Sequence, residues 1–131
     1  MPNNQITELL TTWEKNYKKG LLTFWLLLLL HSQKAYAFEM SSLIEELSQG
    51  SVQVDDNSIY RALKRFTKMG LVASDWQDSS QGPPRKYYCL TNLGKHLLKI
   101  FIQQNILIFQ TDEVNEKLVA VLADEEEAKN G

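Results

Sequence analysis

An apolar run, LLTFWLLLLL at Leu21–Leu30, restricts the fold of this chain more than any other segment. A helix that crosses a membrane needs about 20 apolar residues, and this run has about half that number. A helix that is apolar on every side has to be surrounded by other protein segments, because water would otherwise contact its surface. We therefore expect residues 21–32 to form a central helix that is buried on nearly all sides.

The residues on either side of this run imitate a secretory signal, because lysines precede it and Ala35-Tyr36-Ala37 follows it. However, the segment before the run is about twenty residues long and contains Glu8 and Glu14, and polar residues separate the run from the apparent cleavage site. Cys89 is the single cysteine, so no disulfide can form within the chain. These features predict a cytoplasmic protein without a membrane segment.

Length and composition favour one small globular domain over a multidomain enzyme. The chain has 131 residues, of which 44% are apolar and 23% are charged, and this suffices for one core with a terminal extension. His31 and His96 are isolated, and neither CxxC nor HExxH occurs, so we expect no metal site and no cofactor. Asp55 and Asp56 have no histidine or nucleophile near them in sequence and are interpreted as helix caps. We therefore expect no enzymatic activity.

Hydrophobic periodicity predicts a mainly α-helical fold with a small β-hairpin. Three helices followed by a two-stranded wing form the winged type of helix-turn-helix, here with an additional N-terminal helix and a long C-terminal helix. A turn cluster at 78–84 separates the two strands. The expected helices cover 4–18, 21–32, 36–49, Asp55–Gly70 and the residues that follow Thr91 or Asn92, and the expected strands cover 71–77 and 85–90.

The last helix has apolar residues on more sides than the rest of one chain can cover. Large apolar residues recur on nearly all its sides over 97–109, and residues 100–109 carry no charge. Burial of each such side chain stabilises by about 1.5–3 kcal/mol, so we expect a homodimer through this helix, assisted by residues 4–18. The helix either continues or breaks near Thr111. The expected dimer contacts are Leu97, Ile100, Phe101, Ile106, Phe109 and Leu118.

The helix after Asp55 is predicted to have one apolar and one basic face. At 100° per residue, its apolar side consists of Ile59, Ala62, Leu63, Phe66 and Met69. The opposite side is polar or cationic and consists of Asn57, Arg61, Lys64 and Lys68, with Arg65 and Ser58 beside them.

The charge distribution favours double-stranded DNA as a partner. Residues 60–99 contain eight lysines and arginines against two aspartates, a local charge of +6, although the whole chain carries −2. A helix that enters the major groove needs donors for base edges near its N-terminus and cations for phosphates around them. We expect Asn57, Ser58 and Arg61 to read bases. We expect Lys64, Arg65 and Lys68, together with Arg85 and Lys86 of the wing, to contact the DNA backbone.

Several segments resemble the PadR-like family of winged-helix repressors. NSIYRALKRF at 57–66 resembles the recognition-helix motif of that family, and MGLV at 69–72 resembles the residues that follow it. GPPRKYYCLT at 82–91 is similar to the wing signature, and the resemblance spans roughly residues 20–98. Pro83 stands where many members have an arginine, and Ala37 stands where a glycine is usual.

This resemblance implies a homodimeric repressor that binds a pseudo-palindromic operator, with Tyr60 as a backbone contact at the start of the recognition helix. A multidrug-binding branch of the family stacks ligands on tryptophans of the long helix, where this chain has Asn105. Another branch, which includes a circadian-clock gene repressor, has a helix before the winged domain and a segment similar to Lys15–Gly20.

Two other functions remain open from the sequence: a winged-helix module that docks an acidic protein, and a ligand-responsive repressor with an unknown small-molecule effector. The expected organisation has four parts. They are an N-terminal helical extension at 1–19, a winged-helix DNA-binding domain at 20–91, a C-terminal dimerisation helix or helices at 92–123, and an acidic, frayed tail at 124–131.

Overall fold

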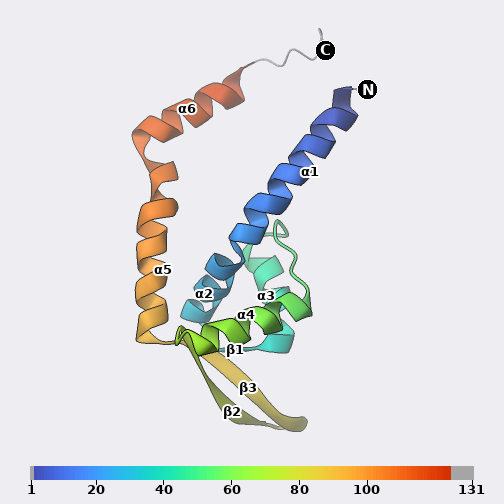
Figure 1. Ribbon diagram of the computed structural model, residues 1–131, viewed down its shortest axis with the longest axis vertical. Coiled ribbons are helices and arrows are strands. Elements are labelled where there is room, and N and C mark those ends of the chain that lie inside the picture. Colours follow the sequence, from blue (N-terminus) through green and yellow to red (C-terminus); the bar gives the residue numbers. More distant parts are fainter. Residues whose placement is uncertain (1, 125–131) are drawn as a thin grey trace.

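A computed structural model describes residues 2–124, so nearly all of the expected acidic tail, at 125–131, lies outside the described residues. The fold is mainly helical with one small antiparallel sheet, which confirms the predicted winged helix-turn-helix class (Figure 1). The elements are α1 (Pro2–Gly20), α2 (Leu22–Ser32), β1 (Ala35–Tyr36), α3 (Ala37–Leu47), α4 (Asp56–Lys68), β2 (Val72–Ser79), β3 (Gly82–Leu90), α5 (Asn92–Asn105), the 3₁₀ helix η1 (Leu107–Gln110) and α6 (Asp112–Ala123).

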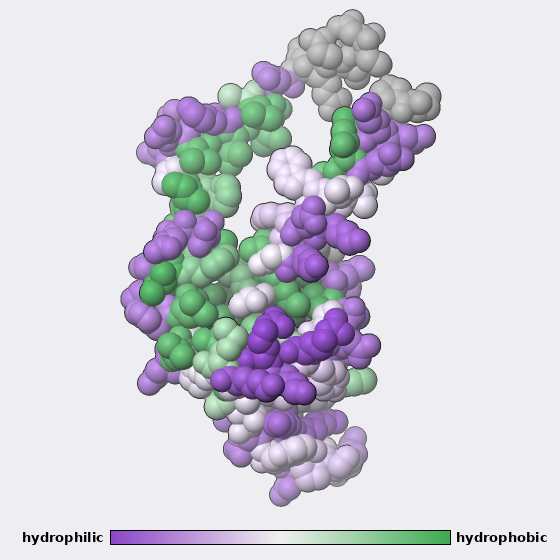
Figure 2. Space-filling model, in the orientation of Figure 1, coloured by the Kyte–Doolittle hydropathy of each residue, from purple (hydrophilic) through white to green (hydrophobic). Residues whose placement is uncertain are grey.

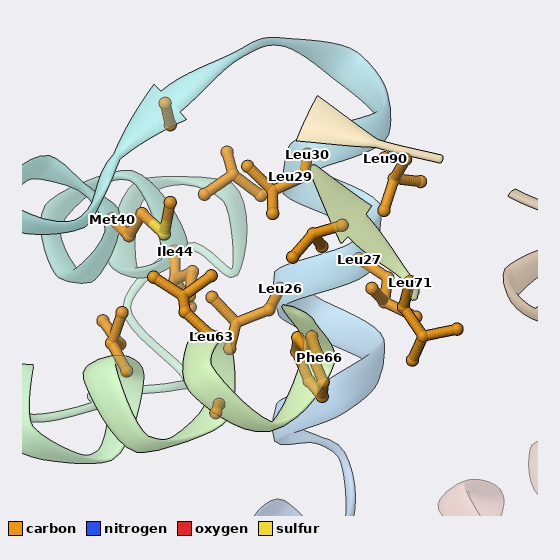
Figure 3. Packing of buried hydrophobic residues seen from close by; sticks show 14 of the residues in the cluster. Leu26, Leu27, Leu29, Leu30, Met40, Ile44, Leu63, Phe66, Leu71 and Leu90 are labelled. Atoms are coloured by element: carbon orange, nitrogen blue, oxygen red, sulfur yellow. The ribbon is translucent and has the colours of Figure 1, made fainter. Parts of the chain in front are cut away.

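The centre of the fold is α2, as the apolar run predicted. Leu26, Leu27, Leu29 and Leu30 are all buried, and α2 contacts α3, β3 and α5. Figure 3 shows that side chains from α3, α4 and the base of the wing converge on it. The residues of that cluster include Met40 and Ile44 of α3, Leu63 and Phe66 of α4, and Leu71 and Leu90 at the base of the wing.

The far side of α2 is covered by α5. The rings of Phe24 on α2 and Phe101 on α5 lie 5.8 Å apart between centroids, and Leu98 of α5 is buried in the core. Helix α5 therefore closes the core of its own chain with one side and leaves its other sides uncovered by this chain.

The sheet has the strand order β1-β3-β2, with both pairs antiparallel. Strand β1 pairs with β3 through Ala35 and Tyr36, which lie opposite Tyr88 and Tyr87. The expectation that Tyr36 begins a helix was wrong: it is the N-cap residue of α3 and belongs to β1. A two-residue strand is too short to show an alternating pattern, so it could not be found by periodicity.

The wing is longer than the sequence predicted. Strands β2 and β3 extend to Ser79 and from Gly82, so the connection between them contains only Ser80 and Gln81. Pro83 and Pro84 lie inside β3 and not in a turn. Strand β3 can accept them there because the register shifts between Gln77 and Ser79, so that neither proline is paired with β2, and because β1 pairs only with the far end of β3.

Met69, which was expected on the apolar side of the helix after Asp55, is exposed, and so is Leu47 at the end of α3. Met69 is 54% exposed, because α4 ends at Lys68 and the chain turns away at Gly70, which has a φ of +77°. Leu47 is 45% exposed at the last position of α3. The other four residues of the predicted apolar side of α4 are buried: Ile59, Ala62, Leu63 and Phe66.

The long C-terminal helix is interrupted, which decides between the two possibilities that the sequence left open. Helix α5 ends at Asn105, η1 follows, and Thr111 caps α6 by accepting a hydrogen bond from the backbone N–H of Val114 at 3.3 Å. Figure 1 shows α5 and α6 as an arm on one side of the molecule, while α1 extends away from the winged domain on the other.

The start of α5 is locked against the loop that leaves α4. The Thr91 hydroxyl donates to the carbonyl oxygen of Gly70 at 2.6 Å and accepts from the backbone N–H of Gly94 at 3.1 Å. The backbone at Gly94 lies so close to Leu71 that a Cβ atom there would overlap the Leu71 carbonyl group. Only glycine fits this contact between α5 and the base of the wing.

Replacement of Gly94 by alanine is expected to destabilise the protein. Because a backbone carbonyl cannot move aside, the added methyl group should lower the free energy of unfolding by about 1–3 kcal/mol. Gly20→Ala is the matched control, since nothing lies within 4 Å of a Cβ at that position. The control should be neutral or more stable by up to about 1 kcal/mol. Urea denaturation measures both, and equal midpoints for the two variants would contradict the close contact.

Candidate nucleic-acid interface

The basic helix α4 begins at a defined cap. The Asp55 carboxylate accepts a hydrogen bond from the backbone N–H of Ser58 at 2.6 Å. This hydrogen bond lowers the pKa of Asp55 below its ordinary value of 3.8. The Ser58 hydroxyl group and, more weakly, the positive charge of Arg61 lower it further. Asp55 is therefore a structural cap, as the sequence predicted, and it fixes where the exposed face of α4 starts.

The side of α4 that faces away from the core is cationic. Asn57, Arg61, Lys64 and Lys68 are exposed, and no acid occurs on the helix after Asp56. Figure 2 shows this hydrophilic surface over α4, continuing toward the wing. Arg65 is also exposed, and its guanidinium carbon lies 5.4 Å from the centroid of the Phe66 ring. Tyr60 is exposed beside this surface.

The residues expected to read bases gather at the N-terminal end of this face. Arg61 donates from Nη2 to the hydroxyl oxygen of Ser58 at 3.3 Å. Ser58 also supplies the backbone N–H that Asp55 accepts. The arginine fork is thus held next to the helix cap, where Asn57 is exposed and Ser58 is half-buried.

The two cations of the wing lie on opposite faces of the hairpin, because neighbouring side chains of a strand alternate. Arg85 lies over the Tyr36 ring, with its guanidinium carbon 4.6 Å from the centroid. Lys86 lies on the other face, with its ammonium 5.9 Å from the Trp76 ring. Trp76 is 65% exposed. Arg85 and Lys86 therefore present two different contact points and not one joint cationic patch.

The residues expected in a dimer interface all keep accessible surface in the single chain. Leu97, Phe109 and Leu118 are exposed, and Ile100, Phe101 and Ile106 are half-buried. Figure 2 shows a hydrophobic surface over α5 and the segment that follows it. A second apolar surface runs along α1, where the exposed residues are Ile6, Leu9, Leu10, Trp13 and Tyr17.

Sequence reasoning missed one basic group beside α4. Lys15, Lys18 and Lys19, here called the α1 lysine cluster, line a cleft of about 430 Å³. The opposite wall of this cleft consists of residues 52–55 and Ser58 of α4. The cluster was missed because the charge count placed it within residues 1–59, whose net charge is negative. The spacing of three lysines in the last turns of a helix was the signal that could have identified it.

No helix within residues 2–124 is long and apolar enough to cross a membrane. In the same part of the chain, no group of three or more histidine, cysteine or acidic side chains is arranged to hold a metal ion.

Residues 26–100 match the family described as "Transcriptional regulator PadR-like family". An uncharacterized protein of Lysinibacillus sphaericus is 29% identical over 86 residues, which cover 66% of this chain and 79% of that protein. A PadR-like transcriptional regulator from Bacillus cereus is 30% identical, with a TM-score of 0.62 over 82% of this chain and 96% of that chain.

The Bacillus subtilis PadR structure, solved in complex with operator DNA, is similar in fold. Its TM-score is 0.57 at 23% identity, over 63% of this chain and 45% of that chain. The chain thus spans less than half the length of that protein.

The cap at Asp55 should make stability depend on pH in acid. Because its pKa in the folded protein lies below the unfolded value, the ionised carboxylate stabilises the fold above about pH 3.8, and this contribution disappears as the pH falls through the lowered folded pKa. Asp55→Ala should therefore lower the denaturation midpoint at pH 7, with a difference from the native protein that shrinks in strong acid. Asp56→Ala, the matched control, should show a smaller loss. A difference that is the same at pH 7 and pH 2 would exclude the carboxylate cap.

Proposed function

Since this chain belongs to the PadR-like family of transcriptional regulators, we propose that it is a homodimeric repressor that binds a pseudo-palindromic operator. The observation that carries this proposal is the exposed cationic face of α4, which lies opposite a fully buried apolar face. A helix with this division can enter a major groove without any change in the core behind it.

In this proposal the first turns of α4 read sequence. Asn57, Ser58 and Arg61 face the base edges, where the arginine fork fits O6 and N7 of guanine. Tyr60, Lys64, Arg65 and Lys68 lie beside or beyond them and contact phosphates, which position the helix without reading sequence. The hydrogen bond between Arg61 and Ser58 supports this role, since it holds the guanidinium near the helix N-terminus before DNA arrives.

Arg85 and Lys86 are proposed as the backbone contacts of the wing. Their positions on opposite faces of the hairpin suit a wing that lies between two strands of the duplex backbone, with one cation directed at each. The Bacillus subtilis protein of similar fold was solved with operator DNA, which supports duplex DNA as the partner in place of an acidic protein.

The dimer is proposed to form through α5, η1 and α6, with α1 assisting. The large apolar side chains that remain exposed on these elements, among them Phe109 at 55% and Leu118 at 46%, would favour association in water. A symmetric dimer presents two copies of α4, and a pseudo-palindromic operator matches that symmetry. Helix α1 precedes the winged domain, as in the branch of the family that includes a circadian-clock gene repressor. On this feature we propose a circadian-clock gene as a target.

Arg61 and Lys68 should affect DNA binding in different ways. Arg61→Ala is expected to reduce the ratio of specific to non-specific affinity, because a bidentate base contact that contributes about 1–3 kcal/mol of discrimination is lost. Lys68→Ala, two turns further along, should weaken binding to both kinds of DNA and leave the ratio nearly unchanged. Fluorescence anisotropy at one fixed salt concentration measures both ratios. An unchanged ratio for Arg61→Ala would show that Arg61 does not read sequence.

Sedimentation equilibrium at micromolar concentration is expected to show a dimer. Leu97→Asp should shift it to monomer, since a charge would enter the apolar interface, while the fold should persist because Leu97 is 41% exposed in the single chain. Leu47→Asp on α3, at a similarly exposed leucine outside the proposed interface, is the control and should remain dimeric. A monomeric native protein would remove the basis for the dimer and for the palindromic operator.

A further inference from the structure

The end of α1 lies beside the N-terminus of α4, on the wall of a shared cleft. Lys15, Lys18 and Lys19 line one side of this cleft, and Asp55 and Ser58 line the other. Ser58 is also the acceptor for Arg61. The α1 lysine cluster therefore borders the same helix turn that carries the proposed base-reading residues.

The cluster keeps most of its charge available. Among the residues that the structure describes, Glu14 is the one acid paired with it, at 3.9 Å from the Lys18 ammonium. The Asp55 carboxylate faces the same cleft, but it is engaged by the backbone N–H of Ser58. Lys15 and Lys19 are exposed and lie one helical turn apart, so both ammonium groups can reach the same ligand.

The position of the cluster complements that of the wing. In Figure 1, α4 lies between the lower end of α1 and the wing, so basic groups occur on both sides of the recognition helix. A helix in the major groove has a phosphate backbone along each of its two sides. The wing lies toward one of these sides, and the α1 lysine cluster lies toward the other.

We propose that the α1 lysine cluster binds phosphates of the DNA backbone on the side of α4 away from the wing. This rests on the proposed function, because it requires α4 to enter the major groove. It assigns to α1 a direct part in DNA binding, in addition to the apolar surface that α1 offers to a second copy of the chain. Because phosphates are common to all sequences, the cluster would raise affinity and not specificity.

A competing explanation is that Lys18 and Lys19 only stabilise α1 itself. Cations in the last turn of a helix interact favourably with its C-terminal carbonyl groups. Such a role would alter the stability of α1 but would not change how DNA affinity depends on salt.

The test compares two double variants with the same spacing and the same loss of charge. Lys15→Gln with Lys19→Gln removes two lysines of the cluster, and Lys95→Gln with Lys99→Gln removes two exposed lysines of α5 as the matched control. Anisotropy titrations with an arbitrary duplex between 50 and 200 mM salt measure the slope of log affinity against log salt. The cluster variant should lower that slope by about one per lysine in each protomer, and the control should leave it nearly unchanged.

Lys15→Arg with Lys19→Arg should restore the slope, since it restores the charge, and circular dichroism should show that all variants are folded. Phosphate-ethylation interference should then lose signals on one side of each recognition helix in the cluster variant, and on the opposite side in Arg85→Gln. A cluster variant with the native slope, or one that changes no more than the control, would overturn the inference. A native protein that binds no duplex at these salt concentrations would instead overturn the proposed function itself.

Discussion

The burial of α2 is the constraint on which the rest of the structure depends. Its leucines point in several directions, so the helix requires cover from α3 and α4, from the base of the wing and from α5 at once. Each covering element packs one apolar side against α2, and its other side is available for contacts outside the core. For α4 that other side is cationic, and for α5 it includes accessible apolar residues such as Leu97 and Ile100. The division between a proposed DNA-binding side and a proposed association side thus follows from one buried helix.

Much of this fold could be predicted because α2 and α4 carry unambiguous patterns. The uniform apolarity of α2 predicted its central place, and the two-sided pattern of α4 predicted four of its buried residues. Predictions failed where the chain leaves a helix or pairs at long range. Met69 follows the end of α4, so a helical wheel no longer applies to it, and β1 exists only because Ala35 and Tyr36 meet Tyr88 and Tyr87 far along the chain.

The candidate interface was predictable to the extent that it lies on one element. The cations of α4 share a helix face, so their grouping follows from spacing alone. The relation between Lys15, Lys19 and Ser58 does not, because it depends on how α1 ends beside the loop before α4. A charge count over residues 1–59 averaged these lysines with acids that mostly do not line the cleft. Local charge is a property of the folded surface, and a sum along the chain can conceal it.

The contact between Gly94 and Leu71, together with the double hydrogen bond of Thr91, makes the junction between α4, the wing and α5 a rigid joint. In the proposed dimer, α5 holds the two protomers together, so this joint would fix the distance and the angle between the two copies of α4. Backbone packing at this junction would then determine the spacing between half-sites that the dimer can bind. An operator with one base pair more or less between its half-sites would be rejected by geometry, even with every base contact intact.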